Sequence, residues 1–445
     1  MSNYFEYVEK LFKSGEKRSL PLKGIKVIEI THYIYGPCVG MVLAQFGAEV
    51  IKIEPPGEGD RRRYRAIWMR MFKKAEPNFL TLNSNKYFIT LDTRNIKARE
   101  ILFKLVEKAD VFIENLRAGL TDQMGIGYLH ISKVNPRIIY VSCSGYGQYG
   151  PLSRAPSFDV SAQGIIGLTM KNGWPDVDEF YKLPDYFGDY FPAMIAVAAI
   201  LAALYYREKT GKGQYIDISQ AESLLRFFYD ITYLSITGEE IGKTGNIDPT
   251  AIASGIFNTS DGRFVAIAIM DEEQLSAISK AMNTELTNLY KGKLRSKECI
   301  NELNDLIFQW VSSKTLDEIL NYAKTYGFPA SPVLTDVEIY KDPWRWERGS
   351  ILEFNDRIYG KIHIPGSAVH LSATPAKIKW LARPVGYHNR LILKKWLGYT
   401  DEEIRILEKE GVIGYWDQVP GPCPPATWNP EDDSVFKGEE DEQER

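Results

Sequence analysis

Two aspartates stand among aromatic residues in the stretch from Lys182 to Met194, which reads KLPDYFGDYFPAM. Four tyrosines and phenylalanines surround Asp185 and Asp189 there, and an uncharged run follows directly. Removing an ionised carboxylate from water is costly unless another group compensates its charge. A carboxylate kept in such surroundings has either a structural or a chemical role, and these residues alone favour a structural role at a helix end.

The run after Asp189 is typical of a helix that begins near this residue, because Pro192 suits a first turn and no charge occurs up to Tyr206. We expect the Asp189 carboxylate at the helix N-terminus, where exposed backbone N–H groups stabilise an anion and can hold an oxyanion. The aromatic neighbours would exclude water. The alternative is that Asp189 only caps the helix; Asp185 fits a loop or rim position better.

The chain of 445 residues is long enough for two domains, or for one large domain with a lobe. Its hydrophobic share of 44% and charged share of 25% are ordinary for a globular protein. Residues 431–445 hold eight acids and two bases, a net of −6, whereas the whole chain carries −4, so the rest has about +2. This weak charge argues against a nucleic-acid partner.

The cysteines and histidines are scattered, which argues against a metal site. The four cysteines, which form no CxxC pair, are Cys38, Cys143, Cys299 and Cys423. Charged residues throughout the first twenty positions exclude a secretory signal. The uncharged run from Tyr190 to Tyr206 is shorter than the roughly 20 residues of a membrane span. We therefore predict a cytoplasmic protein with reduced thiols, no metal and no membrane contact.

Strand-like and helical segments alternate through the first 150 residues. The strand-like segments are GIKVIEI, EVIKIE, YFITLD, ADVFIEN and RIIYVSCSG, and one helix is expected from about Ile96 to Ala109. This alternation predicts an α/β domain with a largely parallel sheet. The turn after the first strand, THYIYGPCVG, lacks the G-x-G-x-x-G spacing of a dinucleotide site, which argues against a dinucleotide enzyme.

The pattern changes from about Gly238. GIFNTSDGRFVAIAI predicts two strands joined at Asp261-Gly262, and three helical patterns follow, which indicates a smaller α/β lobe. ILEFNDRIYGKIHI returns to strand-like sequence, and a capping box of Thr400 and Glu403 opens a late helix. The Pro-rich and acidic end of the chain reads as an extended arm with a disordered tip.

Six motifs follow one another along the chain. They read PLKGIKVIEITHYIYGPCVGMVLAQFGAEVIKIEPPGEGDRRR, NSNKYFITLDTRN, ADVFIENLRAGLTDQMGIGYLHISKVNPRIIYVSCSGYGQYGP, GDYFPAMIAVAAILAALYYREKTGKGQYIDIS, YGFPASPVLTDVEIYKDP and LGYTDEEIRILEKEGVI. From about Pro21 to Ile413 the chain thus resembles the family III coenzyme A transferases, a group that includes formyl-CoA transferase, carnitine CoA-transferase and the 2-methylacyl-CoA racemases. The motifs are specific for this superfamily and not for one substrate.

The resemblance implies a large Rossmann-like domain built from both chain ends, with a smaller α/β lobe inserted, in an interlocked, ring-like homodimer. We accordingly expect residues 1–225, with the CoA site and the catalytic aspartate, and residues 346–415 to form the large domain. Residues 226–345 would form the small domain, and residues 416–445 the Pro-rich arm and acidic tail. A homologous second subunit in place of an identical one is the alternative.

The resemblance also assigns a role to Asp189. In the transferases of this family, the aspartate of the Gly-Asp pair before the ILAAL helix is the nucleophile, and Asp189 holds that position. The racemases use the same aspartate as an acid–base group and place a histidine before an upstream aspartate, where this chain has Phe158-Asp159. Phenylalanine cannot carry a proton, which argues against two-base proton exchange. Asp159 is expected to brace the segment that follows it, and His32 is a loop residue that could line the site.

Coenzyme A carries phosphates and an adenine, so its site needs cations and flat apolar walls. By resemblance, Arg94 approaches the adenosine end of CoA, and Tyr33 touches the cofactor through its backbone. Three further residues are expected along the cofactor path, namely Asn115, Leu116 and Arg117. For both Arg94 and Arg117 a solvated charge at a helix end is the alternative. Residues 61–63, an arginine triplet, are a weaker candidate because such triplets are usually solvated surface.

Two departures from formyl-CoA transferase put phosphate contacts and the shielding of intermediates in doubt. Gln123 stands where that enzyme has a cofactor-lining arginine, and its glycine-rich loop has no counterpart near residues 251–255. The aromatic segment 170–187 is expected to shape the acyl pocket, with a variable surface loop as the alternative.

The function implied is a CoA-transferase that moves CoA between an acyl-CoA donor and a free carboxylic acid acceptor. The reaction would pass through an aspartyl mixed anhydride and an aspartyl-CoA thioester at Asp189. A CoA-ester isomerase or racemase on the same scaffold, and a non-catalytic CoA-binding protein, are the alternatives. The residues do not indicate which two acids are exchanged.

Overall fold

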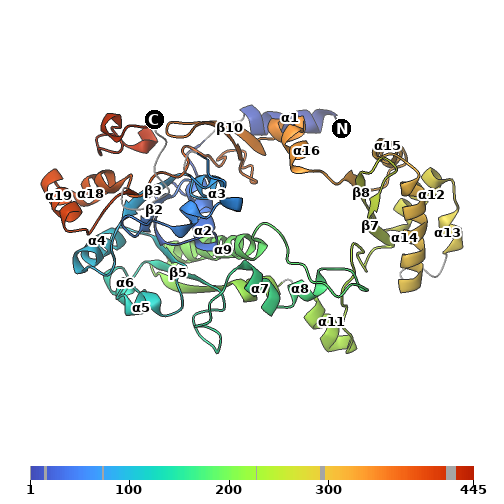
Figure 1. Ribbon diagram of the computed structural model, residues 1–445, viewed down its shortest axis with the longest axis horizontal. Coiled ribbons are helices and arrows are strands. Elements are labelled where there is room, and N and C mark those ends of the chain that lie inside the picture. Colours follow the sequence, from blue (N-terminus) through green and yellow to red (C-terminus); the bar gives the residue numbers. More distant parts are fainter. Residues whose placement is uncertain are drawn as a thin grey trace. The chain divides into compact units, whose positions relative to one another are not determined.

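A computed structural model describes residues 2–14, 18–72, 75–226, 228–290, 296–416 and 427–444 (Figure 1). The chain forms two compact units. Unit 1 comprises Met1–Ile166, Pro184–Phe228 and Trp344–Arg445, and unit 2 comprises Gly167–Leu183 and Tyr229–Pro343. Residues 167–183 thus belong by their contacts to the smaller unit, although the sequence placed them in the large domain; the domain boundaries themselves stay a prediction.

Unit 1 is built on a six-stranded sheet in which every neighbouring pair is parallel. The strands are β1 (Lys26–Ile30), β2 (Glu49–Glu54), β3 (Lys86–Thr90), β4 (Val111–Glu114), β5 (Ile139–Ser144) and β6 (Gln214–Ser219). Their order, β3-β2-β1-β4-β5-β6, is the Rossmann order, so the predicted α/β class is confirmed. Five strands match predicted segments. The sixth, QYIDIS, was missed because it lies at the edge of the sheet and alternates apolar with polar residues.

Helices cover both faces of this sheet, because alternate residues of each strand point to opposite sides. Val27, Val50 and Val141 pack with α2 (Tyr35–Gln45) and α9 (Phe187–Thr210). Ile28, Ile51 and Phe112 pack on the other side. The helices there are α4 (Ile96–Val106), α6 (Tyr128–Val134), α18 (Asn389–Leu397) and α19 (Asp401–Lys409). The sheet is therefore buried on both sides, as its near-continuous apolar strands require.

The two ends of the chain meet at the edge strand β3. The backbone N–H of Phe88 donates to His388 Nδ1 at 2.8 Å, and that of Thr90 donates to Asn389 Oδ1 at 2.8 Å. In Figure 1, α18 and α19 (red) accordingly lie beside α4 and β3 (blue). A hairpin of β10 (Ile351–Asp356) and β11 (Gly360–Pro365) precedes this segment. The expectation that both chain ends build the large domain is confirmed.

The acidic end of the chain is ordered over residues 427–444, which contradicts the predicted disordered tip. Glu442 is buried and its Oε1 accepts a hydrogen bond from Arg383 Nη2 at 2.7 Å. The Tyr87 hydroxyl of β3 donates to Asp441 Oδ1 at 2.8 Å. The buried Arg383 neutralises Glu442, and the Tyr87 hydroxyl satisfies Asp441, so a composition typical of disorder does not prevent this segment from docking. Residues 417–426 of the predicted arm lie outside the described residues.

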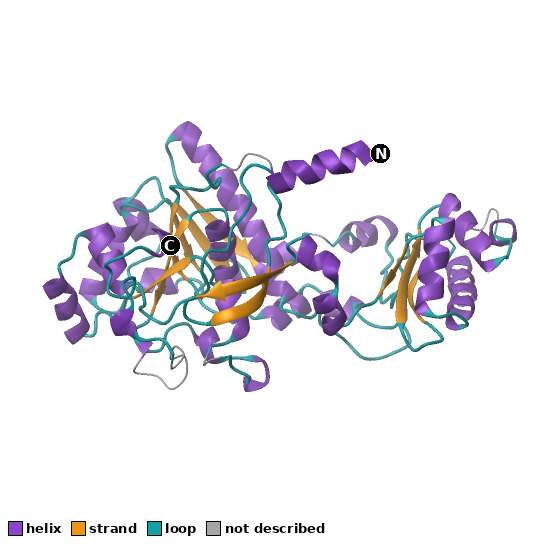
Figure 2. Cartoon of the chain, turned by 90° about the horizontal axis from the view of Figure 1, so that it is seen from above, coloured by secondary structure: helices purple, strands orange, loops and turns teal. Residues whose placement is uncertain are grey.

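Unit 2 contains a three-stranded antiparallel sheet in the order β7-β8-β9. The strands are β7 (Ala253–Asn258), β8 (Phe264–Ile269) and β9 (Ala330–Pro332). Gly262 adopts a φ of 73° in the turn between β7 and β8, so the predicted Asp261-Gly262 hairpin is confirmed. Helices flank this small sheet (Figure 2), among them α12 (Glu272–Met282), α14 (Lys297–Ser312) and α15 (Leu316–Tyr326).

Among the described residues, α9 is the helix that is long and apolar enough to cross a membrane by length and composition. One face of α9 contributes Ala193, Ala196 and Ile200 to the core beneath the sheet. A core helix passes the same composition test as a membrane span, and this packing identifies α9 as a core helix of unit 1. Shorter elements of unit 1 include α1 (Ser2–Ser14), α3 (Pro77–Leu82), α7 (Asp159–Ile165), α10 (Gln220–Leu225) and the 3-10 turn η1 (Arg61–Tyr64).

Candidate active site

A cavity of about 1180 Å³ opens at the carboxyl ends of the parallel strands of unit 1. Residues at or just after the ends of β1, β2, β4 and β5 line it, for example Ile30, Ile53, Asn115 and Cys143. The strand order reverses between β1 and β4, and ligands bind at this position in open parallel sheets. The residues predicted from the sequence all line this one cavity: Tyr33, Arg94, Asn115, Leu116, Arg117 and Asp189. His32 and Gln123 line it as well.

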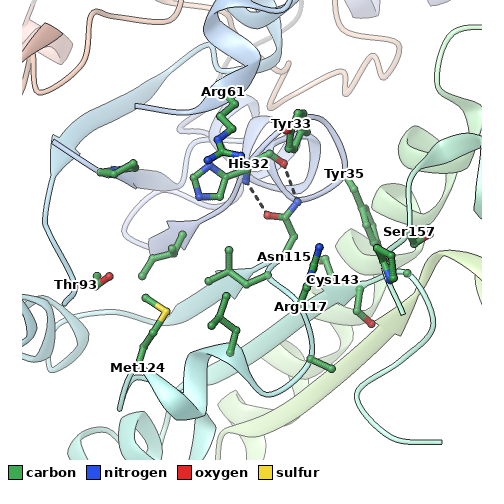
Figure 3. Close-up of a pocket in the computed structure, with 18 of the residues that line it drawn as sticks. His32, Tyr33, Tyr35, Arg61, Thr93, Asn115, Arg117, Met124, Cys143 and Ser157 are labelled. Atoms are coloured by element: carbon green, nitrogen blue, oxygen red, sulfur yellow. Dashed lines mark hydrogen bonds between the residues drawn. The ribbon is translucent and has the colours of Figure 1, made fainter. Parts of the chain in front are cut away.

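Asn115 fixes the loop that follows β1. Its Oδ1 accepts a hydrogen bond from the His32 backbone N–H at 2.8 Å, and its Nδ2 donates to the His32 carbonyl at 2.8 Å (Figure 3). Tyr33 adopts a left-handed φ of 63°, and its N–H donates to Asp60 Oδ1 at 3.1 Å. The Asn115 side chain is therefore engaged with the backbone of His32, and it fixes the His32–Tyr33 wall of the cavity.

Buried charges hold this loop from below. Lys52 Nζ donates to the Thr31 carbonyl at 2.7 Å and lies 3.1 Å from Asp60 Oδ2. Lys86 Nζ lies 2.8 Å from Glu29 Oε1, and burial lowers the pKa of Lys86 to about 8. Gly40 leaves room for this pair, because a Cβ at this position would lie 1.8 Å from Glu29 Oε2. Paired buried charges of this kind fix one arrangement of the loop, since breaking either pair would leave an uncompensated charge.

The arginine triplet is mostly buried, which contradicts its interpretation as solvated surface. Only Arg61 is exposed, and it pairs with Glu58 at 3.0 Å. Arg62 lies 3.3 Å from Glu76 Oε1 and over the Tyr186 ring at 5.1 Å. Arg63 forms a two-point contact with Glu54, with distances of 2.8 and 2.9 Å. The partners of the two buried arginines, Glu76 and Glu54, lie 14 and 9 residues away in the sequence, so the triplet alone could not reveal the pairing.

Arg94 and Arg117 both reach the cavity from exposed positions. The Arg94 side chain is 87% exposed and forms a two-point ion pair with Asp92, with distances of 2.8 and 3.0 Å. For Arg117 no side-chain hydrogen bond or ion pair is found within the described part of the chain. Arg117 is therefore the more available cation for a phosphate, because its charge is not already shared with a carboxylate.

Asp189 is the third residue of α9 and does not cap this helix. The N–H of Gly188 donates to Asp159 Oδ1 at 2.8 Å, so Asp159 of α7 anchors the helix start in addition to holding Gln163 in its own helix. The N–H groups of Asp189 and Tyr190 both donate to the Tyr186 carbonyl, at 2.8 and 3.0 Å. The prediction that free N–H groups of this turn hold an oxyanion is therefore wrong: these donors already have partners.

The backbone before α9 is strained. Asp185 and Tyr186 have φ values of 54° and 58°, in the left-handed region that costs a side-chain-bearing residue roughly 1–2 kcal/mol. Asp185 is exposed, in agreement with its predicted rim position. The strained turn is held where the Tyr186 ring meets Arg62, and strain of this kind is typical of functional sites.

The Asp189 carboxylate is half-buried and faces the cavity. Its Oδ1 accepts a hydrogen bond from Gln220 Nε2 at 2.6 Å. Burial raises the pKa of Asp189 to about 7 and the nearby Asp159 carboxylate adds to the rise, whereas Arg62 and the Gln220 hydrogen bond act in the opposite direction. Because one side of the carboxylate is open to the cavity, a bound substrate that displaces water would strengthen all four effects.

The aromatic walls come from other residues than expected. Tyr33, Tyr35 and Phe158 line the cavity, and the Tyr33 and Phe158 rings meet edge to face at 5.7 Å. The four aromatic neighbours of Asp189 in sequence are not among the residues found to line the cavity in the described chain. Tyr190, for example, does not line the cavity; its hydroxyl accepts a hydrogen bond from Asn78 Nδ2 at 3.0 Å. Successive helical residues point about 100° apart, which turns the neighbours of Asp189 away from it.

Sequence reasoning missed Gln220, which is bonded to Asp189, and Ser157, which lines the same cavity and is bonded to Gln220. Ser157 Oγ donates to Gln220 Oε1 at 3.1 Å, and Gln220 begins α10 directly after β6. The signal for Gln220 was Ser219 followed three residues later by Glu222, which marks a helix start at the carboxyl end of a strand. Within the described residues, no group of three or more His, Cys, Asp or Glu side chains is arranged to hold a metal ion.

Known proteins share this fold and sequence over most of the chain. Residues 22–389 match the family model described as CoA-transferase family III. The chain is 31% identical over 417 residues to the succinyl-CoA–D-citramalate CoA-transferase of Chloroflexus aurantiacus, which covers 90% of this chain and 100% of that protein. It is 31% identical over 402 residues to the succinyl-CoA:glutarate CoA-transferase of Homo sapiens, with 88% of this chain and 90% of that protein covered.

A solved structure agrees with these relatives. A CAIB/BAIF family protein from Brucella suis superimposes with a TM-score of 0.75 at 28% identity, and the match covers 85% of this chain and 100% of that one. The fold and the matches define an α/β transferase that acts on thioesters of coenzyme A. The chain belongs to CoA-transferase family III, which confirms the predicted resemblance.

Proposed function

We propose that this enzyme transfers CoA from an acyl-CoA to a free carboxylic acid with Asp189 as the nucleophile. The observation that supports this assignment is the Asp189 carboxylate in the cavity, with a pKa of about 7 that keeps much of it ionised at neutral pH. Arg94 and Arg117 at the same cavity suit the phosphates of CoA, and the Leu116 and Tyr33 wall suits its apolar and flat parts.

The proposed reaction has four steps. An oxygen of Asp189 attacks the donor thioester carbon and expels the CoA thiolate, which gives a mixed anhydride. The thiolate attacks Cγ of Asp189, and the donor acid leaves as a carboxylate while an aspartyl-CoA thioester forms. The acceptor carboxylate attacks the same Cγ and expels the thiolate again. The thiolate then attacks the acceptor acyl carbon, which releases the acceptor acyl-CoA and the free Asp189 carboxylate.

We propose succinyl-CoA as the first donor to test and short dicarboxylic acids as the first acceptors. The two relatives described above are named for succinyl-CoA and for citramalate or glutarate. Exposed arginines at the cavity, Arg61 and Arg154 among them, could meet the second carboxylate of such an acid. A monocarboxylate of equal length is the matched control, because it lacks only that second charge.

The experiment is an exchange assay with succinyl-CoA and an isotopically labelled acid, read by mass spectrometry. Wild-type protein should form the labelled acyl-CoA, and Asp189→Asn should lose several orders of magnitude of rate, because an amide forms no anhydride. Hydroxylamine added during turnover should modify the wild-type protein at Asp189. Near-normal exchange by a folded Asp189→Asn protein would falsify the assignment of the nucleophile.

The same assay in deuterated water separates an isomerase from a transferase. Phe158 lines the cavity at the position where the racemases carry a histidine, so the second proton carrier expected of a racemase is missing there. Deuterium at the α-carbon without CoA exchange would favour the isomerase. Binding of acyl-CoA without either reaction would favour a non-catalytic CoA-binding protein.

We also propose the interlocked homodimer and a cytoplasmic location for this enzyme. An apolar stripe on α9 supports a partner chain, since Met194 and Leu201 are 43% and 38% exposed and Tyr205 is 61% exposed. These residues lie at helical spacing on one face, and monomeric proteins rarely expose contiguous apolar surface of this kind. The cytoplasmic location is proposed because Cys38 and Cys143 are buried and form no disulfide among the described residues.

A further inference from the structure

Gln220 is held in one orientation at the Asp189 carboxylate. It is 4% exposed, and its Nε2 donates to Asp189 Oδ1 at 2.6 Å and to the Gly188 carbonyl at 3.1 Å. Its Oε1 accepts from Ser157 Oγ at 3.1 Å. All the hydrogen-bonding groups of this amide therefore have partners, and turning the amide over would face Oε1 against two acceptors. The structure thus fixes an N–H donor, and not an acceptor, at Asp189.

The two oxygens of Asp189 are unequal as a result. Oδ1 is bonded to Gln220, whereas no hydrogen bond to Oδ2 is found among the described residues. The backbone N–H groups of the first turn of α9 are already used within the protein, as described above. Gln220 is therefore the donor at this carboxylate in the described chain, and the free Oδ2 is the oxygen that can approach a substrate carbon.

We propose that Gln220 is the positioning residue of Asp189. Gln220 binds Oδ1, so that Oδ2 is left to attack, and it donates to Oδ1 when negative charge develops on that oxygen. The inference rests on the nucleophilic role proposed for Asp189. After Oδ2 has attacked the acyl carbon, Oδ1 is the carbonyl oxygen of the anhydride. When the thiolate then attacks Cγ, the electron pair of that carbonyl moves to Oδ1, and it returns as the donor acid leaves with Oδ2. The acceptor carboxylate later supplies the replacing oxygen.

Gln220 therefore acts in both steps at Cγ, in which the tetrahedral intermediate carries its charge on Oδ1. A preorganised donor at such an oxygen is among the largest single contributions to acyl-transfer catalysis. The other titratable or charged groups around Asp189 do not supply this donor. Asp159 is an acceptor, and Arg62 acts at longer range from η1. The Tyr35 hydroxyl of α2 donates to the Ile218 carbonyl, and the Tyr190 hydroxyl of α9 is bonded to Asn78. Cys38 of α2 is a further neighbour, with no hydrogen bond to Asp189 among the described residues.

The test is Gln220→Leu, which keeps the size of the side chain and removes its donor. We expect kcat to fall about 100-fold while the KM for acyl-CoA changes less than about threefold, because the lost contact serves the transition state and not cofactor binding. The acidic limb of the pH–rate profile should also move to higher pH by about one unit, since the lost hydrogen bond favours the carboxylate. A purely structural role would lower the rate without moving this limb.

Two further variants make the result decisive. Gln214→Leu is the same substitution at the start of β6, outside the residues that line the cavity, and it should leave the profile unchanged. Ser157→Ala removes the hydrogen bond to Gln220 Oε1 and so loosens the amide at Asp189. We expect a several-fold smaller loss with a limb shift in the same direction, and this variant serves if Gln220→Leu does not fold.

The outcomes separate this inference from the proposed nucleophile. An unmoved limb in both Gln220→Leu and Ser157→Ala, with Asp189→Asn inactive, overturns the role of Gln220 alone. Exchange by Asp189→Asn overturns the nucleophile, whatever the Gln220 variants do. A kcat of Gln220→Leu within threefold of wild type also overturns the role of Gln220, because the loss of a transition-state donor must lower kcat.

Discussion

In the proposed mechanism Asp189 would have to meet two opposing requirements: a nucleophile must be ionised, but a mixed anhydride survives only where water is scarce. The protein reconciles them with a half-buried carboxylate. Burial disfavours the charge, and Arg62 and Gln220 restore part of it, which leaves the pKa of Asp189 at about 7. A deeper position without these partners would keep the group protonated at neutral pH, and a fully solvated one would expose the anhydride to hydrolysis.

The first prediction at this scale is a pH dependence. Because the nucleophile must be ionised, kcat/KM should rise with pH and level off above about pH 8, with its half-point near the Asp189 pKa of about 7. The profile is measured with initial rates in buffers of constant ionic strength. A flat profile between pH 5.5 and 8 (the range in which an aspartate with this pKa changes charge) would contradict the assignment.

The raised pKa of Asp189 also predicts that the stability of the fold decreases with rising pH, whereas the activity increases. The folded protein binds the Asp189 proton more tightly than the unfolded chain, whose aspartates titrate near their ordinary pKa of about 3.9. The stabilisation by the protonated form is therefore lost as pH rises through about 7. Asp189→Asn should unfold at a higher temperature than wild type at pH 8, and the two should differ less at pH 5. Asp185→Asn, at an exposed position, is the control.

The arginines of the cavity should differ in their effect on CoA binding. Arg117→Ala should raise the KM for acyl-CoA about tenfold, whereas Arg94→Ala should raise it less, because Asp92 already shares the Arg94 charge. In both variants kcat should change little, since a phosphate remote from the thioester is bound equally in ground and transition states. Arg405→Ala, an exposed arginine of α19, controls for the loss of surface charge. Equal KM values for all three variants would place the phosphates elsewhere.

The candidate site could be predicted only in part from the residues. Asp189, Arg94 and Arg117 were found because the motifs fix their chain positions relative to a known family. The donor at Asp189 was misassigned, because the sequence does not show that Asp159 and the Tyr186 carbonyl occupy the first turn of α9. Gln220 follows Asp189 by 31 residues and meets it only through the packing of α9 against α10.

At the scale of elements, the last described segment contacts the edge strand of the sheet, because the Tyr87 hydroxyl of β3 donates to Asp441. Strands β1 to β5 could be predicted because their apolar runs are local signals, and a buried parallel strand needs no partner-specific residue. The ordered end of the chain could not be predicted this way. Its acids match basic and hydrogen-bonding partners such as Arg383 and Tyr87, and only the folded chain brings those partners to them.

Glu442 provides the prediction for this segment. Glu442→Gln should destabilise the protein by about 3 kcal/mol, because it leaves the buried Arg383 with Asp356 as its remaining carboxylate partner. Glu439→Gln, at an exposed position of the same segment, should change the free energy of unfolding by less than about 0.5 kcal/mol. Both are measured by denaturant unfolding at pH 7. Equal stability of the two variants would mean that the segment does not dock in solution.

The pH dependence of this pair has a defined sign. Burial opposes the charge of Glu442, but Arg383 and the His388 hydrogen bond outweigh it and hold the pKa of Glu442 below its usual range. Its stabilisation is therefore complete above the ordinary glutamate pKa of about 4.3 and is lost as pH falls below that value. The difference in the free energy of unfolding between wild type and Glu442→Gln should accordingly become smaller from pH 5 toward pH 3.

At the scale of the whole molecule, the two units were predicted from the change of pattern near Gly238, since antiparallel hairpin signals and βαβ signals differ along the chain. The sequence did not predict that one face of α9 is exposed, because a run without charged residues is typical of a fully buried helix. In the folded chain one side of α9 packs under the sheet, and the other carries the apolar stripe of Met194, Leu201 and Tyr205. A single chain therefore leaves apolar surface on its central helix.

The last prediction is that a second chain covers this stripe. An obligate interface of interlocked chains should bury well over about 2,000 Å², so the protein of 50.7 kDa per chain should sediment as a species of twice that mass at all accessible concentrations. Leu201→Arg places a charge in the stripe and should yield monomer or insoluble protein, whereas Leu129→Arg, at an exposed position of α6, should leave the dimer intact. Native mass spectrometry of the purified chain distinguishes an identical partner from a co-purified homologous one. A stable and active monomer of wild-type protein would contradict the interlocked arrangement, because chains threaded through one another cannot separate without unfolding.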